Sequence, residues 1–228
     1  MPEIPAFARL GAARTEFAGA IFDFDGTLAD SMWVWNDIDR RFCEEYHLAL
    51  PDDYTDSIVG LGFEGTAKYF IEELGLKMSV DQCCNEFNRI AKKSYCTRVL
   101  LRPGARTFLK ELKGSGIPVA IASSLVMDLL QPALERNDAF DLIDAFRLCD
   151  DYNTHKSETL IYELAAEAIG VPVEECVIFE DILPAVRSIK RAGAFAVAVI
   201  DESNEAQNTE VIQKEADLCI ADFTELLA

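Results

Sequence analysis

Basic residues are scarce in this 228-residue chain: 21 lysines and arginines stand against 40 aspartates and glutamates, and the formal net charge at pH 7 is −19. Because nucleic acids and anionic membranes attract basic surfaces, this balance predicts neither of them as a partner. An acidic surface also repels anionic substrates. A phosphate-binding site would therefore need local compensation from a metal ion, a lysine and backbone N–H groups.

Long hydrophobic runs are also missing, although half of the residues are hydrophobic. No run approaches the roughly 20 residues that a bilayer-spanning helix needs, so we expect no membrane span. The first 17 residues lack the apolar stretch of a secretion signal, and we interpret them as a short N-terminal extension.

The cysteines form no metal-binding or disulfide pattern. Their number is odd, two of them are adjacent, and no spacing suits zinc or a compact disulfide framework. We interpret them as buried free thiols in a reducing cytosol, which predicts a cytoplasmic protein. The seven positions are Cys43, Cys83, Cys84, Cys96, Cys149, Cys176 and Cys219.

Apolar runs alternate with helical patterns over most of the chain. The runs are continuous, as in strands of a parallel sheet that helices cover on both faces. We therefore predict an α/β fold with a Rossmann-like parallel sheet as the middle of three α/β/α layers. Strands are expected at residues 20–24, 119–123, 145–149, 176–180 and 195–200, with a short one at 218–220, and helices at 105–113, 157–169 and 183–192.

The interval between residues 31 and 97 interrupts this alternation. It contains no convincing strand, and helical patterns fall at about 32–46, 63–74 and 80–95. We predict an all-helical domain at 31–97, inserted into a core domain formed by residues 1–30 and 98–228. An insertion at this point is expected to overhang the carboxyl edge of the sheet, where open α/β sheets bind ligands.

Asp23-Phe24-Asp25-Gly26-Thr27 follows the first apolar run. Two carboxylates so close together repel each other unless a cation or a shared proton offsets their charge. The pattern therefore favours a divalent metal ion or a pair made of a nucleophile and an acid. The alternative is an Asp-rich turn that caps a helix at Thr27 or Ser31, since these are ordinary turn residues.

Polar residues also end the later apolar runs. Ser123 and Ser124 could bring hydroxyl and backbone N–H groups into the same cleft, or one could cap the next helix. Lys156 opens a predicted helix and could equally be a solvated surface charge. Glu180 and Asp181 offer oxygen ligands suited to Mg²⁺, or else a helix N-terminal pair stabilised by the helix dipole.

Taken together and in this order, these motifs resemble the haloacid dehalogenase superfamily. The similarity is to the branch with a helical cap after the first strand, which includes the β-phosphoglucomutase and phosphoglycolate phosphatase-like group. It covers nearly the whole chain from Ala18 onward, and Arg102-Pro103-Gly104 before a helix also matches. The resemblance implies a cap over 31–97 and a phosphoric monoester hydrolase.

The resemblance also implies roles for individual residues. Asp23 would be the nucleophile that forms an aspartyl-phosphate, and Asp25 the general acid and then the general base. Ser123, with the backbone at Ser124, would bind the phosphoryl oxygens. Lys156 would neutralise the nucleophile and the transferring group.

A Mg²⁺ site is implied as well. Its ligands would be Asp23, the backbone carbonyl of Asp25, and Asp181 with Glu180 beside it. The substrate would be a small phosphorylated metabolite, a sugar phosphate or a similar phosphomonoester. We expect the protein to be a monomer or a weak dimer.

Two other functions stay open. A phosphosugar mutase of the β-phosphoglucomutase type is disfavoured because Trp35 and Phe63 fall near places where those enzymes carry a histidine and a basic residue. Dehalogenases lack the second aspartate, so Asp25 argues against that reaction. A non-catalytic phosphate-binding protein is the alternative of another class.

Overall fold

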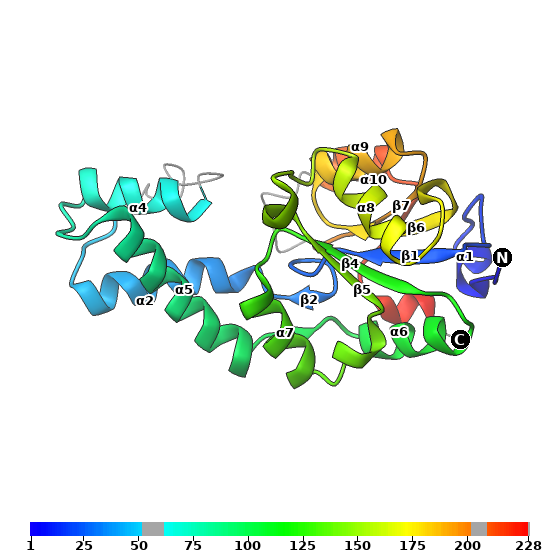
Figure 1. Ribbon diagram of the computed structural model, residues 1–228, viewed down its shortest axis with the longest axis horizontal. Helices are drawn as coiled ribbons and strands as arrows, with labels where there is room; N and C mark the ends of the chain where they lie inside the picture. The colour runs from blue at the N-terminus through cyan, green and yellow to red at the C-terminus, as the bar shows by residue number, and fades with distance from the viewer. Residues whose placement is uncertain (52–61, 202–208, 228) are drawn as a thin grey trace. The chain divides into compact units, whose positions relative to one another are not determined.

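The computed structural model describes residues 1–51, 62–201 and 209–227 (Figure 1). Internal contacts divide the chain into two compact units: Met1–Ser31 with Val99–Ala228, here called the sheet unit, and Met32–Arg98, here called the helical unit. Over the described ranges, no helix combines the length and the apolar character that membrane crossing requires.

The sheet unit contains two sheets and most of the helices. Its strands are β1 (Gly19–Phe22), β2 (Ala29–Asp30), β3 (Leu100–Leu101), β4 (Val119–Ser123), β5 (Ala145–Leu148), β6 (Cys176–Glu180), β7 (Phe195–Val199) and β8 (Leu218–Ile220). Its α-helices are α1 (Pro5–Arg9), α6 (Ala105–Gly114), α7 (Met127–Arg136), α8 (Leu160–Ala168), α9 (Leu183–Arg191) and α10 (Thr209–Glu215). Short 3-10 helices are η1 (Phe140–Leu142), η2 (Cys149–Tyr152), η3 (Val173–Glu175) and η5 (Phe223–Leu226).

The large sheet has six strands in the order β5-β4-β1-β6-β7-β8, and all of its pairs are parallel. The predicted Rossmann-like α/β fold is confirmed. The first strand lies in the middle, and the chain fills one side of it before it crosses to the other. This reversal places the carboxyl ends of β4, β1 and β6 next to one another.

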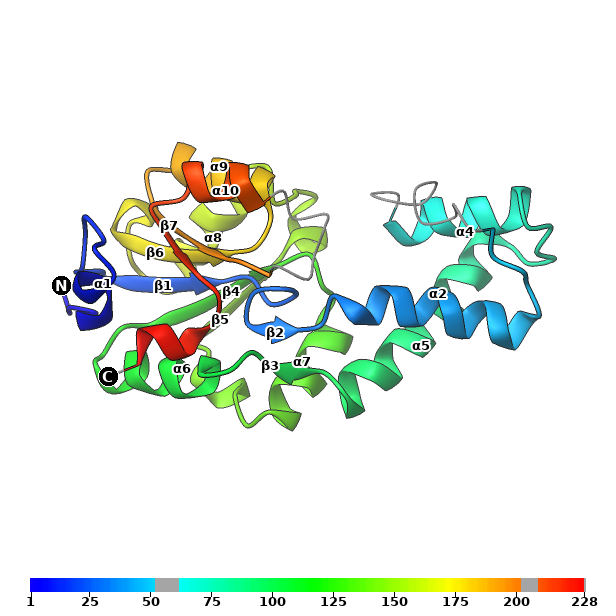
Figure 2. The same cartoon turned by 180° about the vertical axis from the view of Figure 1, so that it is seen from behind.

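Helices cover both faces of the sheet, which explains the continuous apolar runs. Every residue of β1, β4, β6 and β7 is buried. Ile21 and Ile178 pack in the core beneath α8 and α9. The rings of Phe22 and Phe179 stack on the other face, 4.5 Å apart, against Phe108 of α6. Figures 1 and 2 show α8, α9 and α10 on one face and α6 and α7 on the other.

The N-terminal segment is part of this core. Phe7 of α1 and Phe17 are fully buried, with ring centroids 5.3 Å apart, and both contact Phe195 of β7. The Ile4 N–H donates a hydrogen bond to the Thr15 carbonyl at 2.7 Å, which closes the segment on itself. The residues interpreted as a short extension therefore supply core side chains.

The helical unit consists of α2 (Trp33–Tyr46), α4 (Gly62–Glu72) and α5 (Val80–Thr97) over its described residues. Its centre is the aromatic cluster of Phe42, Phe70 and Phe87, which are all fully buried. A capping box formed by Ser79 and Gln82 begins α5.

A short antiparallel pair joins the segments that leave and re-enter the sheet unit. Ala29 and Asp30 of β2 pair with Leu101 and Leu100 of β3. Two residues per strand are too few to give a periodic pattern, so this pair has no signature in the sequence.

Candidate active site

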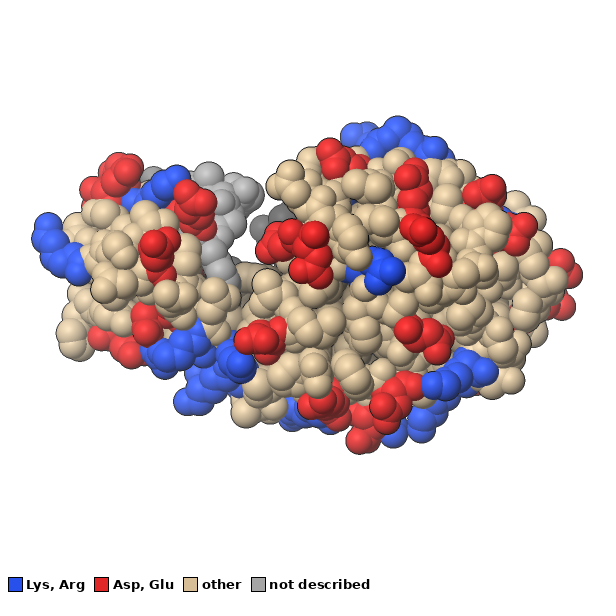
Figure 3. All heavy atoms as spheres, viewed as in Figure 1, with Lys and Arg blue, Asp and Glu red and all other residues tan. Residues whose placement is uncertain are grey.

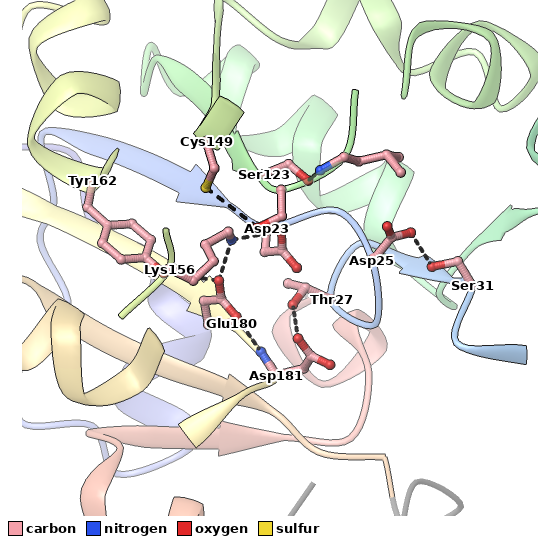
Figure 4. A network of polar contacts seen from close by, with 12 residues as sticks. Asp23, Asp25, Thr27, Ser31, Ser123, Cys149, Lys156, Tyr162, Glu180 and Asp181 are labelled. Carbon is pink, nitrogen blue, oxygen red and sulfur yellow. Dashed lines mark hydrogen bonds and ion pairs between the residues drawn. The ribbon is translucent and has the colours of Figure 1, made fainter. Parts of the chain in front are cut away.

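Three adjacent strands bring the predicted site residues to one edge of the sheet. Asp23 directly follows β1, Ser123 ends β4, and Glu180 ends β6. The Asp23 N–H donates a hydrogen bond to the Phe179 carbonyl at 3.0 Å, so the parallel pairing continues up to the carboxylate. Figure 4 shows Asp23, Lys156, Glu180 and Asp181 gathered at this edge.

Lys156 connects two of these carboxylates. It lies between η2 and α8, is 7% exposed, and donates to Asp23 Oδ1 at 2.8 Å and to Glu180 Oε1. Burial opposes the charged form of the lysine, but the two carboxylates outweigh it and raise the Lys156 pKa above its usual value. The side chain is therefore a buried cation and not a solvated surface charge.

Glu180 is completely buried and has a partner at each oxygen. Its Oε1 accepts from Lys156 and from the Tyr162 hydroxyl at 3.0 Å, and its Oε2 accepts from the Asp181 N–H at 3.0 Å. Burial raises the Glu180 pKa, and Lys156 opposes that shift. The carboxylate is held in a single orientation by groups from three segments of the chain.

Asp23, Glu180 and Asp181 form a cluster of three buried carboxylates, with one oxygen of each within 4.8 Å of the others. Burial, followed by the charges of Glu180 and Asp23, raises the Asp181 pKa well above its usual value. Among the described residues, Lys156 is the lysine that faces these three acids, and it offsets only part of their mutual repulsion. Oxygen-only clusters of this kind suit a hard divalent cation.

Asp25 has a different environment. Its carboxylate accepts a hydrogen bond from the Ser31 hydroxyl at 2.6 Å, and its side chain is half-buried. Figure 4 shows Asp25 directed toward Ser31, while Asp23 is directed toward Lys156. Its carboxylate is not part of the three-acid cluster. The predicted ligand from this residue is its backbone carbonyl, which stays a prediction.

Ser123 and Ser124 form a polar turn after β4. The Ser123 hydroxyl is buried and accepts a hydrogen bond from the Leu125 N–H at 3.1 Å. The Ser124 hydroxyl donates to the Cys149 sulfur at 3.5 Å. The helix that follows, α7, begins only at Met127, and its N-cap, Val126, makes no side-chain capping bond. Neither serine therefore caps that helix, and phosphate binding at this turn stays a prediction.

Three further residues belong to the network: Thr27, which ends the Asp23–Thr27 motif, and Tyr162 and Cys149, to which the sequence assigned no place in the site. Tyr162 donates to Glu180, Cys149 accepts from Ser124, and the Thr27 hydroxyl lies 3.5 Å from Asp181 Oδ1. Burial raises the pKa of both Tyr162 and Cys149, so the phenol and the thiol stay protonated. The only signal in the sequence was their closeness to predicted strand and helix ends.

Comparison with known proteins identifies the class of this site. A family model described as haloacid dehalogenase-like hydrolase matches residues 20–199, which include all the site residues named above. The chain belongs to the haloacid dehalogenase-like hydrolase family. The resemblance inferred from its motifs is confirmed, and the protein is an enzyme of that family.

Several curated relatives are named phosphatases. The chain is 27% identical to validoxylamine A 7′-phosphate phosphatase of Streptomyces hygroscopicus subsp. limoneus, over 91% of this chain and 94% of that protein. It is 28% identical to the phosphorylated carbohydrates phosphatase of Thermotoga maritima, over 76% and 80% of the two chains.

A solved structure gives a similar overall match. It is a Thermotoga maritima protein provisionally assigned as a β-phosphoglucomutase, with a TM-score of 0.79 and 25% identity over 91% of this chain and 96% of that one.

Proposed function

We propose that the protein is a Mg²⁺-dependent phosphatase that hydrolyses a small phosphorylated metabolite, a sugar phosphate or a similar phosphomonoester, through an aspartyl-phosphate. The observation that carries the proposal is the buried Asp23–Lys156–Glu180 network beside Asp181 at the carboxyl edge of the sheet. Support comes from relatives whose names give phosphorylated carbohydrates and validoxylamine A 7′-phosphate as their substrates.

Asp23 is the proposed nucleophile. Lys156 holds one of its oxygens at 2.8 Å, which fixes the carboxylate and offsets part of its charge. Attack by an anion on an anionic phosphoryl group needs such compensation, because phosphoryl transfer depends mainly on positioning and charge neutralisation. In a second step, water would attack the phosphoenzyme, release phosphate and restore the carboxylate.

Asp25 is the proposed general acid and base. It would protonate the leaving oxygen in the first step and deprotonate the attacking water in the second. The bond from Ser31 occupies one carboxylate oxygen and fixes how the other is presented. Ser123 and the backbone around Ser124 are proposed to bind the phosphoryl oxygens.

Mg²⁺ is the proposed metal, because the donor set is all oxygen and its charge exceeds what Lys156 can balance. Asp23, Asp181 with Glu180 beside it, and the backbone carbonyl of Asp25 would hold it. When bound, the ion would supply positive charge next to the transferring phosphoryl group.

A panel of phosphorylated metabolites, assayed for inorganic phosphate release with Mg²⁺ and with excess chelator, tests the proposal. We expect turnover of at least one sugar phosphate with Mg²⁺, near-complete loss on chelation, and no turnover by Asp23→Asn, whose amide is not a nucleophile. Undiminished turnover after exhaustive chelation would refute the metal assignment.

Phosphoryl transfer to a sugar, as in a phosphosugar mutase, is the competing reaction. Residues of the helical unit would determine whether water or the sugar accepts the phosphoryl group. We propose that residues 31–97 form a cap over the core domain of residues 1–30 and 98–228. Trp35, in α2, carries no charge; Phe63 belongs to α4, but its side chain lies outside the described residues. Incubation with β-glucose 1-phosphate and a bisphosphate primer should release phosphate or give no reaction. Rapid formation of glucose 6-phosphate would favour the mutase.

A further inference from the structure

The turn that follows Asp25 depends on a glycine in a left-handed conformation. Gly26 has a φ of 75°, its N–H donates to the Ala29 carbonyl at 3.1 Å, and the Ala29 N–H donates to the Phe24 carbonyl at 2.8 Å. Glycine has the widest conformational freedom of any residue. The two internal bonds close the turn, and contacts from outside it restrict its orientation further.

Arg102 contacts this turn at two carbonyls. Its backbone N–H donates to the Leu28 carbonyl at 2.7 Å, and its side-chain Nε donates to the Gly26 carbonyl at 2.9 Å. The guanidinium also pairs with Asp201, just after β7, with Nη2 2.9 Å from Oδ2. The two charged side chains are only 10% and 17% exposed, so salt screens them less than a surface pair.

The side-chain bond from Arg102 restricts Gly26, the residue of the turn with the widest conformational freedom. Because a peptide unit is planar, fixing the direction of the Gly26 carbonyl fixes ψ of Gly26 and the plane of its bond to Thr27. A bond from a charged donor is about twice as strong as one between neutral groups. The rigid guanidinium fork, anchored on Asp201, holds its Nε in place for this contact.

We propose that Arg102 is a positioning residue that holds the Gly26 turn, and with it Asp25, in the arrangement needed for acid catalysis. The inference rests on the function proposed above for Asp25. Asp201 supports it by anchoring the guanidinium. Arg102 touches neither substrate nor reacting atoms in this role, and its effect passes through the backbone next to Asp25.

The chemistry of the leaving group separates this role from general stabilisation of the fold. p-Nitrophenolate leaves without being protonated, whereas the phenolate of phenyl phosphate is a poorer leaving group and gains from a general acid. The two substrates are similar in size and shape. A misplaced Asp25 should therefore slow the reaction of phenyl phosphate more than that of p-nitrophenyl phosphate.

The test measures kcat/KM with Mg²⁺ for both aryl phosphates in Arg102→Ala. We expect a loss of about tenfold or more for phenyl phosphate and less than about threefold for p-nitrophenyl phosphate. Arg106→Ala is the matched control. Arg106 also donates from Nε to a carbonyl, that of Asp138 at 3.2 Å, and pairs with the Asp138 carboxylate at 3.2 Å. Its removal should leave the ratio of the two rates unchanged.

Equal losses for the two substrates in Arg102→Ala would overturn the inference. If that variant does not unfold cooperatively, Asp201→Ala decides, because it keeps the guanidinium but removes its anchor. In Asp201→Ala we expect the ratio of the two kcat/KM values to change in the same direction but by less. An unchanged ratio would contradict the positioning role of Arg102. Asp25→Asn, which lacks the proposed acid, gives the reference change in this ratio. Failure of the wild type on both aryl phosphates and on every metabolite of the panel would instead refute the proposed function.

Discussion

Lys156 is the residue on which the charge balance of the sheet edge depends. It pairs with both Asp23 and Glu180, and all three side chains are at least nine-tenths buried. Removing one partner from a buried ion pair leaves an uncompensated charge, which costs far more than the pair itself contributes. The lysine therefore has a structural role in addition to any catalytic one.

Lys156→Met should lower the free energy of unfolding at about pH 7 by roughly 3–5 kcal/mol, because two buried carboxylates lose their cation. Urea unfolding measures the change. Lys190→Met is the control: Lys190 also pairs with an aspartate, Asp217, but its side chain is 41% exposed. That variant should lose less than about 1 kcal/mol. Equal losses in the two variants would show that burial of the Lys156 network does not determine the change in the free energy of unfolding.

The sequence predicted part of this network, for a physical reason. Asp23, Lys156 and Glu180 each follow or end a recognisable strand or open a helix, and parallel strands end at one edge. The bond from Tyr162 to Glu180 at 3.0 Å could not be predicted, since it depends on how α8, which packs on β4 and β5, directs that side chain toward the end of β6. The same holds for Arg102 and Gly26, which are 76 residues apart in the chain.

At the scale of elements, the first 17 residues show how a short segment can become part of a core. Pattern analysis found no helix or strand there, because the apolar residues of this segment follow neither a helical nor a strand period. Yet Ile4, Ala6, Phe7 and Phe17 are buried, and Phe7 also contacts Phe179 of β6. The β2–β3 pair was missed for a different reason, since two residues per strand are too few to form a pattern.

Phe7→Ala should destabilise the protein by about 3–5 kcal/mol, as expected when a fully buried ring leaves a cavity. Thermal or urea unfolding is the measurement. Phe140→Ala serves as the control, since Phe140 is only half-buried in η1, where its ring stacks on Phe146. A smaller loss is expected there. A Phe7 variant as stable as the wild type would mean that the N-terminal segment does not contribute to the core.

Helix α2 carries a titratable group in an unfavourable environment. Burial raises the pKa of Asp39 from 3.8 to about 6. The folded protein therefore binds this proton more tightly than the unfolded chain, and the associated stability is lost as the pH rises through about 4 to 6.

Asp39→Asn should accordingly be more stable than the wild type at about pH 7, by up to about 3 kcal/mol, with the advantage vanishing toward about pH 4. Urea unfolding across this pH range tests it. Asp81→Asn, in the exposed first turn of α5, is the control and should show no such gain. An Asp39 variant whose difference from the wild type does not depend on pH would contradict the shifted pKa.

For the whole molecule, the excess of acidic residues must be reconciled with an anionic substrate. Figure 3 shows acidic side chains distributed over the visible face, with the basic ones in several separate groups. A net charge of −19 gives no long-range attraction for a phosphate ester. Compensation must then be local, from Lys156, backbone N–H groups and the proposed metal ion. Predictions of a cytoplasmic monomer or weak dimer without a nucleic-acid partner stay open to experiment.

The central claim is that Asp23 receives the phosphoryl group. Its most direct test is to quench the reaction of the wild type with Mg²⁺ and labelled acetyl phosphate in acid and to map the label by mass spectrometry. We predict a hydroxylamine-labile acyl phosphate on the peptide that contains Asp23, and none in Asp23→Asn. Label on another residue, or phosphate release by Asp23→Asn at the wild-type rate, would contradict the account.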